Sequence, residues 1–384
     1  MLRRVLIASM VGLFALSSIG CTRRADEDHV RVLDAMALTD ENYVRWLGRT
    51  HYDEIEETMQ FYHVTSGFEV RFFGTELTVT LHTSNTDDAA RKPYFVVTLG
   101  EQSPRDGITI TPTQDLSTIT LVTGLDEGYH TVRFLKRSES VDAMSAVSSI
   151  STDGYFVAPE PQHATNLLLI GGSGISGRGV LGAQHQAATT SNSNPFYAFG
   201  YLLGEALEAN VQFVAARGWG LKWGYNPTNQ DGLVNIRAAF DVVGIDDQHA
   251  LVEVPYDFGN FVPDYIVINL GGNDFAAHIN ALSPTEASQA QQLFQQAVIE
   301  FVNHLHDIYP NATIFWTHTG TAPGQLASAV LSDLDPRRDF VEAVTLLGVG
   351  ADGDPIGAAN HATYPTHLRN ATILYDIIQS RNQP

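Results

Sequence analysis

A glycine-rich stretch follows an apolar run at residues 167–182, where the chain reads LLLIGGSGISGRGVLG. The apolar part is typical of a buried strand, and six glycines and two serines come after it. Such a loop suits two kinds of chemistry. Glycines let a backbone approach a phosphate closely, and they can also hold a nucleophilic serine at the tip of a sheet.

The phosphate alternative rests on the spacing Gly172-x-Gly174-x-x-Gly177, which formally fits the dinucleotide-binding fingerprint. Arg217, at the end of the next apolar run, could then meet a 2′-phosphate. That fingerprint requires a helix to begin at once, whereas polar loop sequence continues here to about residue 194. This argues against a nucleotide site. The serine motif G-x-S-x-G is not met either, because Ile175 occupies its final glycine position.

The loop GGSGISGRG (171–179) resembles the first sequence block of the SGNH (GDSL) hydrolases. Within them it is most similar to acetyl esterases of carbohydrate esterase family two, whose block is roughly G-D-S-I-T-x-G-x-G. Three later stretches resemble further blocks of that family, in the right order: ARGWG (216–220), INLGGNDF (268–275) and NHATYPTH (360–367). The stretches at 65–79 and 124–140 resemble the β-sandwich that precedes the hydrolase domain, so the resemblance covers nearly all of the mature chain.

The resemblance implies a serine esterase that removes acetyl groups from sugar hydroxyls, of the xylan type or another, through an acyl-enzyme. Ser173 would be the nucleophile and His361 the base, because a serine hydroxyl attacks well only when an adjacent imidazole takes its proton. The oxyanion would be stabilised by the backbone N–H groups of Ser173 and Gly218 and by the side chain of Asn273. His367 matches a second histidine of the family.

The chain departs from the family pattern at two acidic positions. Gly172 stands where the family has an aspartate that braces the loop, and Ala358 and Ala359 stand where it has the aspartate that orients the histidine. Two arrangements stay open: a Ser–His dyad held by a backbone carbonyl, as in some members of family two, or a triad completed by Asp352 or Asp354. A second class of function also stays open, namely a catalytically impaired carbohydrate-binding lipoprotein.

Aromatic residues near the blocks are candidates for sugar binding, and two histidines on a predicted helix are candidates for metal binding. The aromatic residues could form a sugar-binding platform or pack in the core: Trp219, Trp223, Tyr225 and Phe275. His304 and His306 are two apart on a predicted helix and face different directions, so they are poor joint metal ligands. With one cysteine and no H-E-x-x-H pattern, we assign no metal and expect no cofactor.

The blocks follow apolar runs that suit strands buried on both faces, at 167–171, 211–216, 265–271, 312–318 and 344–349. Helical segments lie between them, at 195–209 and 283–310. In the second, Ser283 can cap the helix, with Pro284 at its first position and Glu286 completing a capping box. The alternation predicts an α/β hydrolase domain over 159–384, with a flavodoxin-like, parallel five-stranded sheet and function at the carboxyl ends of its strands.

The preceding residues 31–158 have the pattern of an all-β sandwich of the jelly-roll type. Short runs with a period of two alternate with turn sequences, at 68–74, 77–83, 94–100, 108–113, 118–124 and 130–137. The stretch APEPQ at 158–162 then marks a linker.

The N-terminus is typical of a secretory signal peptide over residues 1–20. Arg3 and Arg4 precede an apolar run and a few small residues, and Cys21, the only cysteine of the chain, follows. SSIGC (17–21) resembles a bacterial lipobox, whose cysteine becomes the lipidated first residue; the alternative is ordinary cleavage with an incidental cysteine. We expect an exported protein anchored by lipid on Cys21 to a bacterial membrane, with residues 21–30 as a tether.

The net charge of −21 excludes some partners. Nucleic acid and an anionic bilayer surface would both repel a chain of this charge. The partner that the resemblance implies is an acetylated oligo- or polysaccharide, and we expect a monomer.

Overall fold

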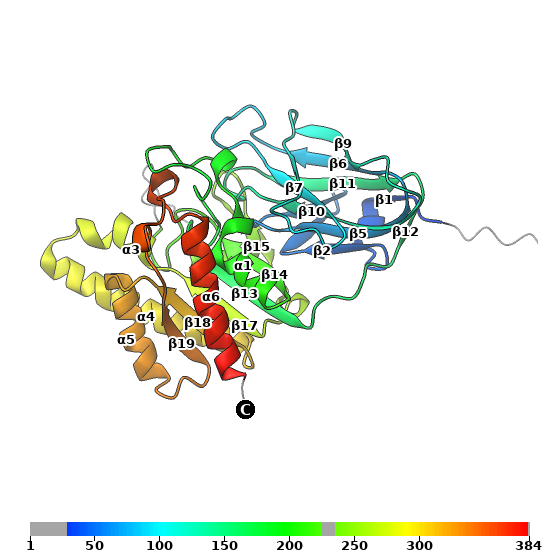
Figure 1. Ribbon diagram of the computed structural model, residues 1–384. Coiled ribbons are helices and arrows are strands. Elements are labelled where there is room, and N and C mark those ends of the chain that lie inside the picture. The colour runs from blue at the N-terminus through cyan, green and yellow to red at the C-terminus, as the bar shows by residue number, and fades with distance from the viewer. Residues whose placement is uncertain (1–28, 225–234, 383–384) are drawn as a thin grey trace, which may run out of the picture.

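The computed structural model describes residues 29–224 and 235–382, and it shows two halves that lie side by side (Figure 1). The first half is built from antiparallel strands, and the second alternates strands and helices. Both expected fold types are therefore present in the expected order. Residues 1–20, which we expect to be a signal peptide, lie outside the described residues, as do Cys21 and Tyr225.

The first half contains two six-stranded antiparallel sheets. One has the order β3-β4-β11-β6-β9 with β1 paired to β11, and the other has the order β12-β5-β10-β7-β8 with β2 paired to β5. The strands are β1 Val32–Asp34, β2 Val44–Leu47, β3 Thr50–Asp53, β4 Thr58–Phe61, β5 Gly67–Gly74, β6 Leu77–Thr83, β7 Phe95–Leu99, β8 Ile108–Ile110, β9 Leu116–Val122, β10 Gly128–Lys136, β11 Ser145–Thr152 and β12 Tyr155–Val157.

The space between these two sheets is filled by aromatic and branched side chains. Phe61 and Phe72 are fully buried there, and the rings of Phe95 and Phe134 stack with centroids 4.8 Å apart. Strands β5 to β10 are the six predicted from alternation, with ends shifted by a few residues. The unpredicted β11 is rich in serine, which hides its alternating pattern, yet Val147 and Ile150 face the core.

The second half is built on a parallel five-stranded sheet with the order β14-β13-β17-β18-β19. This order places the first strand between the second and third, as in flavodoxin-like folds. The strands are β13 Thr165–Gly171, β14 Ala209–Ala215, β17 Tyr265–Asn269, β18 Thr313–His318 and β19 Val341–Thr345. A two-stranded antiparallel pair, β15 Val242–Ile245 and β16 Leu251–Pro255, lies apart from this sheet.

Helices cover both faces of the parallel sheet, so its strands need apolar residues at every position. Leu167 and Leu169 pack with helices α1 and α6 on one face, and Leu168 and Ile170 pack with α2, α4 and α5 on the other. The helices are α1 Phe199–Ala206, α2 Ile236–Phe240, α3 Gly272–Ala277, α4 Pro284–Ile308, α5 Ala322–Leu334 and α6 Tyr364–Arg381. Within the described ranges, none of them is long and apolar enough to cross a membrane.

The start of helix α4 matches its prediction, whereas the bounds of the last strand do not. Helix α4 begins as predicted, with Pro284 in its first turn and the reciprocal Ser283–Glu286 capping box. The last strand was expected at 344–349 but occupies Val341–Thr345. The reason is local: the backbone of Leu347 bonds the side chain of Asn370 on α6 instead of a neighbouring strand (N···Oδ1 2.8 Å, Nδ2···O 3.2 Å).

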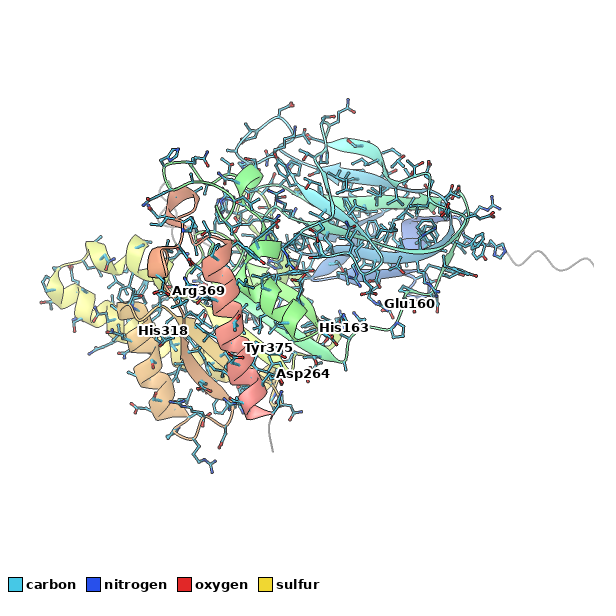
Figure 2. The ribbon with its side chains drawn as sticks, in the orientation of Figure 1. Glu160, His163, Asp264, His318, Arg369 and Tyr375 are labelled. Carbon is cyan, nitrogen blue, oxygen red and sulfur yellow. The ribbon has the colours of Figure 1, made fainter. Side chains whose placement is uncertain are left out.

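The connection between the halves runs from Val157 to Thr165 and is held at both ends. Figure 2 shows Glu160 and His163 along it. The carboxylate of Glu160 pairs with Arg71 at 3.0 Å, and the His163 carbonyl accepts a hydrogen bond from Asn210 at 2.8 Å. The linker is thus fixed to the strands on either side.

Candidate active site

Ser173 lies two residues beyond β13, at the carboxyl edge of the parallel sheet. A tight turn holds it there: the amides of Ile175 and Ser176 both donate to the Gly172 carbonyl at 3.2 Å, and the Arg178 amide donates to the Ser173 carbonyl at 3.0 Å. The serine is half-buried and lines a cleft of about 190 Å³. Its hydroxyl forms no hydrogen bond with another described residue, so it is available to a substrate.

Three hydrogen-bond donors that follow the carboxyl ends of β13, β14 and β17 are the candidates for an oxyanion hole. The backbone N–H groups of Ser173 and Gly218 donate to no other group in the described chain. Gly218 adopts a left-handed φ of +78°, which glycine tolerates without strain. The Asn273 amide, in the first turn of α3, donates one hydrogen to the Trp219 carbonyl at 2.7 Å, and this bond orients its other hydrogen-bonding positions.

The glycine at position 172 has a steric role in this arrangement. A Cβ atom built there would lie 2.9 Å from the Asn273 amide nitrogen and 3.2 Å from the Trp219 carbonyl oxygen. Both distances are shorter than ordinary van der Waals contact. Gly172 therefore lets the Asn273 amide sit directly against the nucleophile turn, in space that an aspartate would occupy.

His361 lies in the segment that leads into α6, and a backbone carbonyl orients its ring. Nδ1 lies 2.9 Å from the Ala358 carbonyl oxygen, so Nδ1 carries the proton and Nε2 is the lone-pair nitrogen available to a serine proton. The carbonyl is aimed by two consecutive left-handed residues, Ala359 at φ +51° and Asn360 at φ +61°. Left-handed conformations are unfavourable for alanine, and such conformations cluster at functional sites.

Neither nearby aspartate reaches His361. Asp352 and Asp354 both pair with Arg369, near the start of α6 (Figure 2). Asp354 also accepts a hydrogen bond from the Thr366 hydroxyl at 2.6 Å, and this bond, with the Arg369 guanidinium, lowers the pKa of Asp354. His361 is thus oriented by a backbone carbonyl and by neither aspartate; within the described chain it forms no hydrogen bond with Ser173, and it is not among the residues that line the cleft.

Glycines also allow close contact between the segment that precedes His361 and the glycine-rich loop 171–182, which we term the nucleophile loop. The Ala358 amide donates to the Gly179 carbonyl and the Ala359 amide to the Gln186 carbonyl, both at 2.9 Å. A Cβ at Gly179 would lie 2.5 Å from the Ala358 carbonyl oxygen, and one at Gly182 would lie 2.7 Å from the Ala358 Cβ. Close backbone contact between the two segments thus requires these glycines, which explains much of the glycine content of the loop.

The dinucleotide alternative finds no support in this geometry. The loop continues past residue 182 to two 3₁₀ turns, Thr190–Asn192 and Pro195–Tyr197, before α1 begins at Phe199. The guanidinium of Arg217 is paired with the carboxylates of Glu139 and Asp142 and is not free for a phosphate.

Asp274 is a functional candidate that the sequence analysis did not single out. Its buried carboxylate accepts hydrogen bonds from the amides of Leu221, Lys222 and Trp223, at 2.8 to 2.9 Å. Burial nevertheless raises its pKa above the ordinary value. The residue beside Asn273 therefore holds the segment that follows Gly218, and its place in the stretch GGND was the available signal.

The four aromatic candidates have different positions. Trp219 lines the cleft but is only 3% exposed, and Phe275 is 6% exposed with its ring packed edge-on against Phe294. Burial argues against a sugar-stacking role for Phe275, which belongs to the core. Trp223 is half-buried and stacks on His278 with centroids 4.5 Å apart. Tyr225 lies outside the described residues.

The cleft is polar and carries no Asp, Glu, Lys or Arg side chain among its described lining residues. Besides Ser173, Trp219 and Asn273, it is lined by Gly172, Gly174, Asn269, Leu270, Gly271, Gly272, Thr317, His318, Thr319, Thr321, Pro323 and Gly324. His318 ends β18 (Figure 2) and was not predicted. Its Nδ1 accepts the Gly320 N–H at 3.1 Å, which leaves a proton on Nε2, and burial lowers its pKa.

The other histidines have structural environments. His367 is buried, and its Nδ1 accepts the Phe199 N–H at 3.2 Å, so it joins α6 to α1. Burial lowers the pKa of His367 to about 4. His304 lies 2.8 Å from the Asp241 carboxylate, and His306 stacks on Phe340 at 4.2 Å.

Comparisons with known proteins agree with this fold. Residues 46–161 match the model for the carbohydrate esterase 2 N-terminal domain, and residues 152–344 match the model for the GDSL-like lipase/acylhydrolase family. An acetylxylan esterase/glucomannan deacetylase of Cellvibrio japonicus is 22% identical over 342 residues, which cover 89% of this chain and 88% of that protein.

Two solved structures share the fold over nearly their whole length. A family two carbohydrate esterase from Clostridium thermocellum in complex with cellohexaose has a TM-score of 0.74 at 22% identity, and the match covers 88% of this chain and 98% of that one. An acetyl xylan esterase from the rumen bacterium Butyrivibrio proteoclasticus has a TM-score of 0.76 at 19% identity, with 92% and 98% covered. The family models and the serine, glycine, asparagine and histidine at successive segment ends lead to one assignment: the chain belongs to the GDSL-like lipase/acylhydrolase family and carries the N-terminal domain of carbohydrate esterase family 2.

Proposed function

We propose that this protein is a serine esterase that removes acetyl groups from the hydroxyls of neutral carbohydrates. The observation that carries the proposal is a set of groups at the carboxyl edge of the parallel sheet: the Ser173 hydroxyl and the amides of Ser173 and Gly218, which make no hydrogen bond within the described chain, and the Asn273 amide. A relative of similar length is named for deacetylation of xylan and glucomannan, which fits this chemistry.

The reaction begins with proton transfer from Ser173 to Nε2 of His361 as the hydroxyl attacks the acetyl carbonyl. The negative charge that develops on the carbonyl oxygen is stabilised by the three donors, in a site where they need not reorganise. The protonated His361 then gives its proton to the departing sugar oxygen, which leaves an acetyl group on Ser173. Water, activated by the same imidazole, releases acetate and restores the serine.

A carbonyl partner changes what His361 can do. The Ala358 oxygen fixes the tautomer and the ring orientation, as a carboxylate would, but it carries no full charge to stabilise the imidazolium. We therefore expect turnover below that of a comparable enzyme with a full triad and well above the uncatalysed rate.

A neutral substrate follows from the electrostatics. The protein has a net charge of −21, and its described cleft offers amides and hydroxyls but no cationic arginine or lysine to bind a carboxylate. A polysaccharide rich in uronic acid would meet repulsion without compensation. The exposed hydroxyls of Thr319 and Thr321 instead provide donors and acceptors of the kind that bind sugar hydroxyls.

We further propose that the enzyme acts outside the cytoplasm, attached to a membrane through lipid on Cys21. The support is the arginine-led apolar run that ends just before that cysteine. Several acyl chains on one cysteine would hold a protein firmly, whereas a single chain binds a bilayer only marginally.

The decisive experiment measures acetate release from acetylated xylan, acetylated glucomannan and a generic acetyl ester by protein lacking residues 1–21. We expect turnover by the wild type and none above background by Ser173→Ala or His361→Ala. Failure of the wild type to release acetate, together with resistance of Ser173 to a serine-directed phosphonate, would refute the esterase. Binding of the polysaccharide by such an inactive protein would assign it to the carbohydrate-binding class instead.

A further inference from the structure

Four charged side chains meet in the interior where the two halves of the molecule touch. Glu139 and Asp142 come from residues 137–144, which follow β10 of the sandwich and which we term the junction loop. Arg178 belongs to the nucleophile loop, and Arg217 directly precedes Gly218. Arg178 lies 2.8 Å from Asp142 and 3.6 Å from Glu139, and Arg217 pairs with both carboxylates. Two negative and two positive charges thus balance.

Glu139 does more than pair with these guanidinium groups. Its Oε1 accepts the backbone N–H of Arg217 at 2.8 Å and the hydroxyl of Ser176 at 2.5 Å. Arg217 is adjacent to Gly218, and Ser176 ends the turn that begins at Gly172 and contains Ser173. One carboxylate oxygen of the sandwich therefore contacts both segments that supply the backbone donors of the oxyanion hole.

The junction loop is itself fixed, so it can serve as a reference point. The Lys136 ammonium donates to the Ala143 carbonyl at 2.7 Å, and the Arg137 guanidinium donates to the carbonyls of Ser191 and Ser193 at 2.8 Å. Glu139 and Asp142 are only 3% and 0% exposed. Buried, fully paired charges resist displacement, because any movement leaves a charge without a partner in the interior.

We propose that Glu139 is a positioning residue of the esterase: through its Oε1 the sandwich sets the spacing between the Ser173 turn and the Gly218 amide. The sandwich is then part of the active site and not a separate appendage. This inference rests on the proposed function, because the spacing matters only if both amides stabilise the same oxyanion. A displacement of about 1 Å in such a site can lower the rate about 100-fold.

The test separates the length of the side chain from its charge. Glu139→Asp keeps the negative charge but withdraws the carboxylate from the Arg217 amide. Glu139→Gln keeps the reach and an acceptor oxygen but removes the charge. Glu69→Asp is the matched control, because Glu69 is a buried sandwich carboxylate that also joins two arginines, Arg45 at 2.6 Å and Arg133 at 2.7 Å.

Turnover and melting temperature are measured for all three variants. We expect Glu139→Asp to lower kcat by about 10- to 100-fold with a smaller change in KM. Glu139→Gln should keep kcat within about threefold of the wild type while its melting temperature falls, since the neutral amide leaves the arginines less well compensated. Glu69→Asp should keep kcat. A Glu139→Asp enzyme with wild-type kcat, or a Glu139→Gln enzyme as slow as Glu139→Asp, overturns the proposal.

Hydrogen exchange of the backbone amides gives a readout that does not require turnover. Peptides that contain Arg217 and Gly218 should exchange faster in Glu139→Asp than in the wild type or in Glu69→Asp. Unchanged exchange overturns the positioning role even if the protein is an active esterase. Faster exchange in a protein that releases no acetate would refute the proposed function and keep the structural link between Glu139 and the Arg217 segment.

Discussion

Substitution of Gly172 by alanine gives a sharp test of the proposed oxyanion hole. The φ angle of Gly172 lies outside the left-handed range, so alanine can adopt the same backbone conformation. The added methyl group is the only perturbation. It would lie 2.9 Å from the Asn273 amide nitrogen, about 0.5 Å inside ordinary van der Waals contact. It would also crowd the Trp219 carbonyl, which is the hydrogen-bond partner of that amide.

The size of the effect follows from how far Asn273 must move. Loss of one side-chain donor of this type lowers kcat by about 10²–10³, and a misplacement of about 1 Å costs about 10². A shift of roughly half that distance should lower kcat by about 10- to 100-fold, or about 1.4–2.7 kcal/mol of transition-state stabilisation.

A double-mutant cycle checks the cause by acetate release from one substrate. Asn273→Ala alone should lower kcat by about 10²–10³. In the Asn273→Ala background the methyl group has no amide to displace, so Gly172→Ala should then change kcat by less than about threefold, and the two substitutions should be strongly non-additive. Gly128→Ala is the control, because a Cβ there meets no atom closer than 3.9 Å.

Two results would refute this reasoning. Equal losses from Gly172→Ala in both backgrounds would show that the methyl group acts on something other than Asn273. Undiminished turnover of Asn273→Ala would remove that side chain from the oxyanion hole altogether.

Three further expectations concern the dyad, the pH dependence and the anchor. Asp352→Asn and Asp354→Asn should change acetate release little, because both carboxylates pair with Arg369; a large loss from either would identify that carboxylate as the third member of a catalytic triad. Burial lowers the pKa of His367 from 6.5 to about 4, so the unfolded chain binds more protons between these values, and the melting temperature should fall as pH decreases from about 6.5 toward 4. His367→Gln should flatten that dependence, and equal slopes for the two proteins would contradict the assignment. Cys21→Ala should move the full-length protein from the membrane fraction to the soluble exported fraction, and identical soluble fractionation of wild type and variant would disprove the lipid anchor.

The placement of the candidate residues at strand ends could be predicted because the short motifs follow apolar runs. Ser173 and Gly218 follow such runs within a few residues, and parallel strands bring their carboxyl ends to one edge of the sheet. Asn273 is positioned in the same way after β17. The fold class was predictable because the two halves have different hydrophobic patterns. The alternating runs form antiparallel strands, and the continuous apolar runs form the buried parallel strands.

Other features depend on contacts that a linear pattern does not encode. The partner of His361 is a main-chain oxygen whose direction depends on the φ angles of Ala359 and Asn360. The types of these two residues do not predict such φ angles. The reach of Glu139 across the junction joins residues 78 positions apart. Phe275 follows the asparagine motif just as a binding aromatic would, yet the short α3 helix turns it into the core against Phe294.

The backbone partner of His361 has a consequence for how this enzyme tolerates change. A single substitution can remove a catalytic aspartate, and acid can protonate its carboxylate. The Ala358 oxygen belongs to the main chain, so no single substitution deletes it and no accessible pH protonates it. A saturation mutagenesis screen should therefore find no acidic side chain whose loss abolishes turnover as completely as the loss of Ser173 or His361. Sensitivity should appear instead at Gly179 and Gly182, where any side chain pushes the Ala358 segment away.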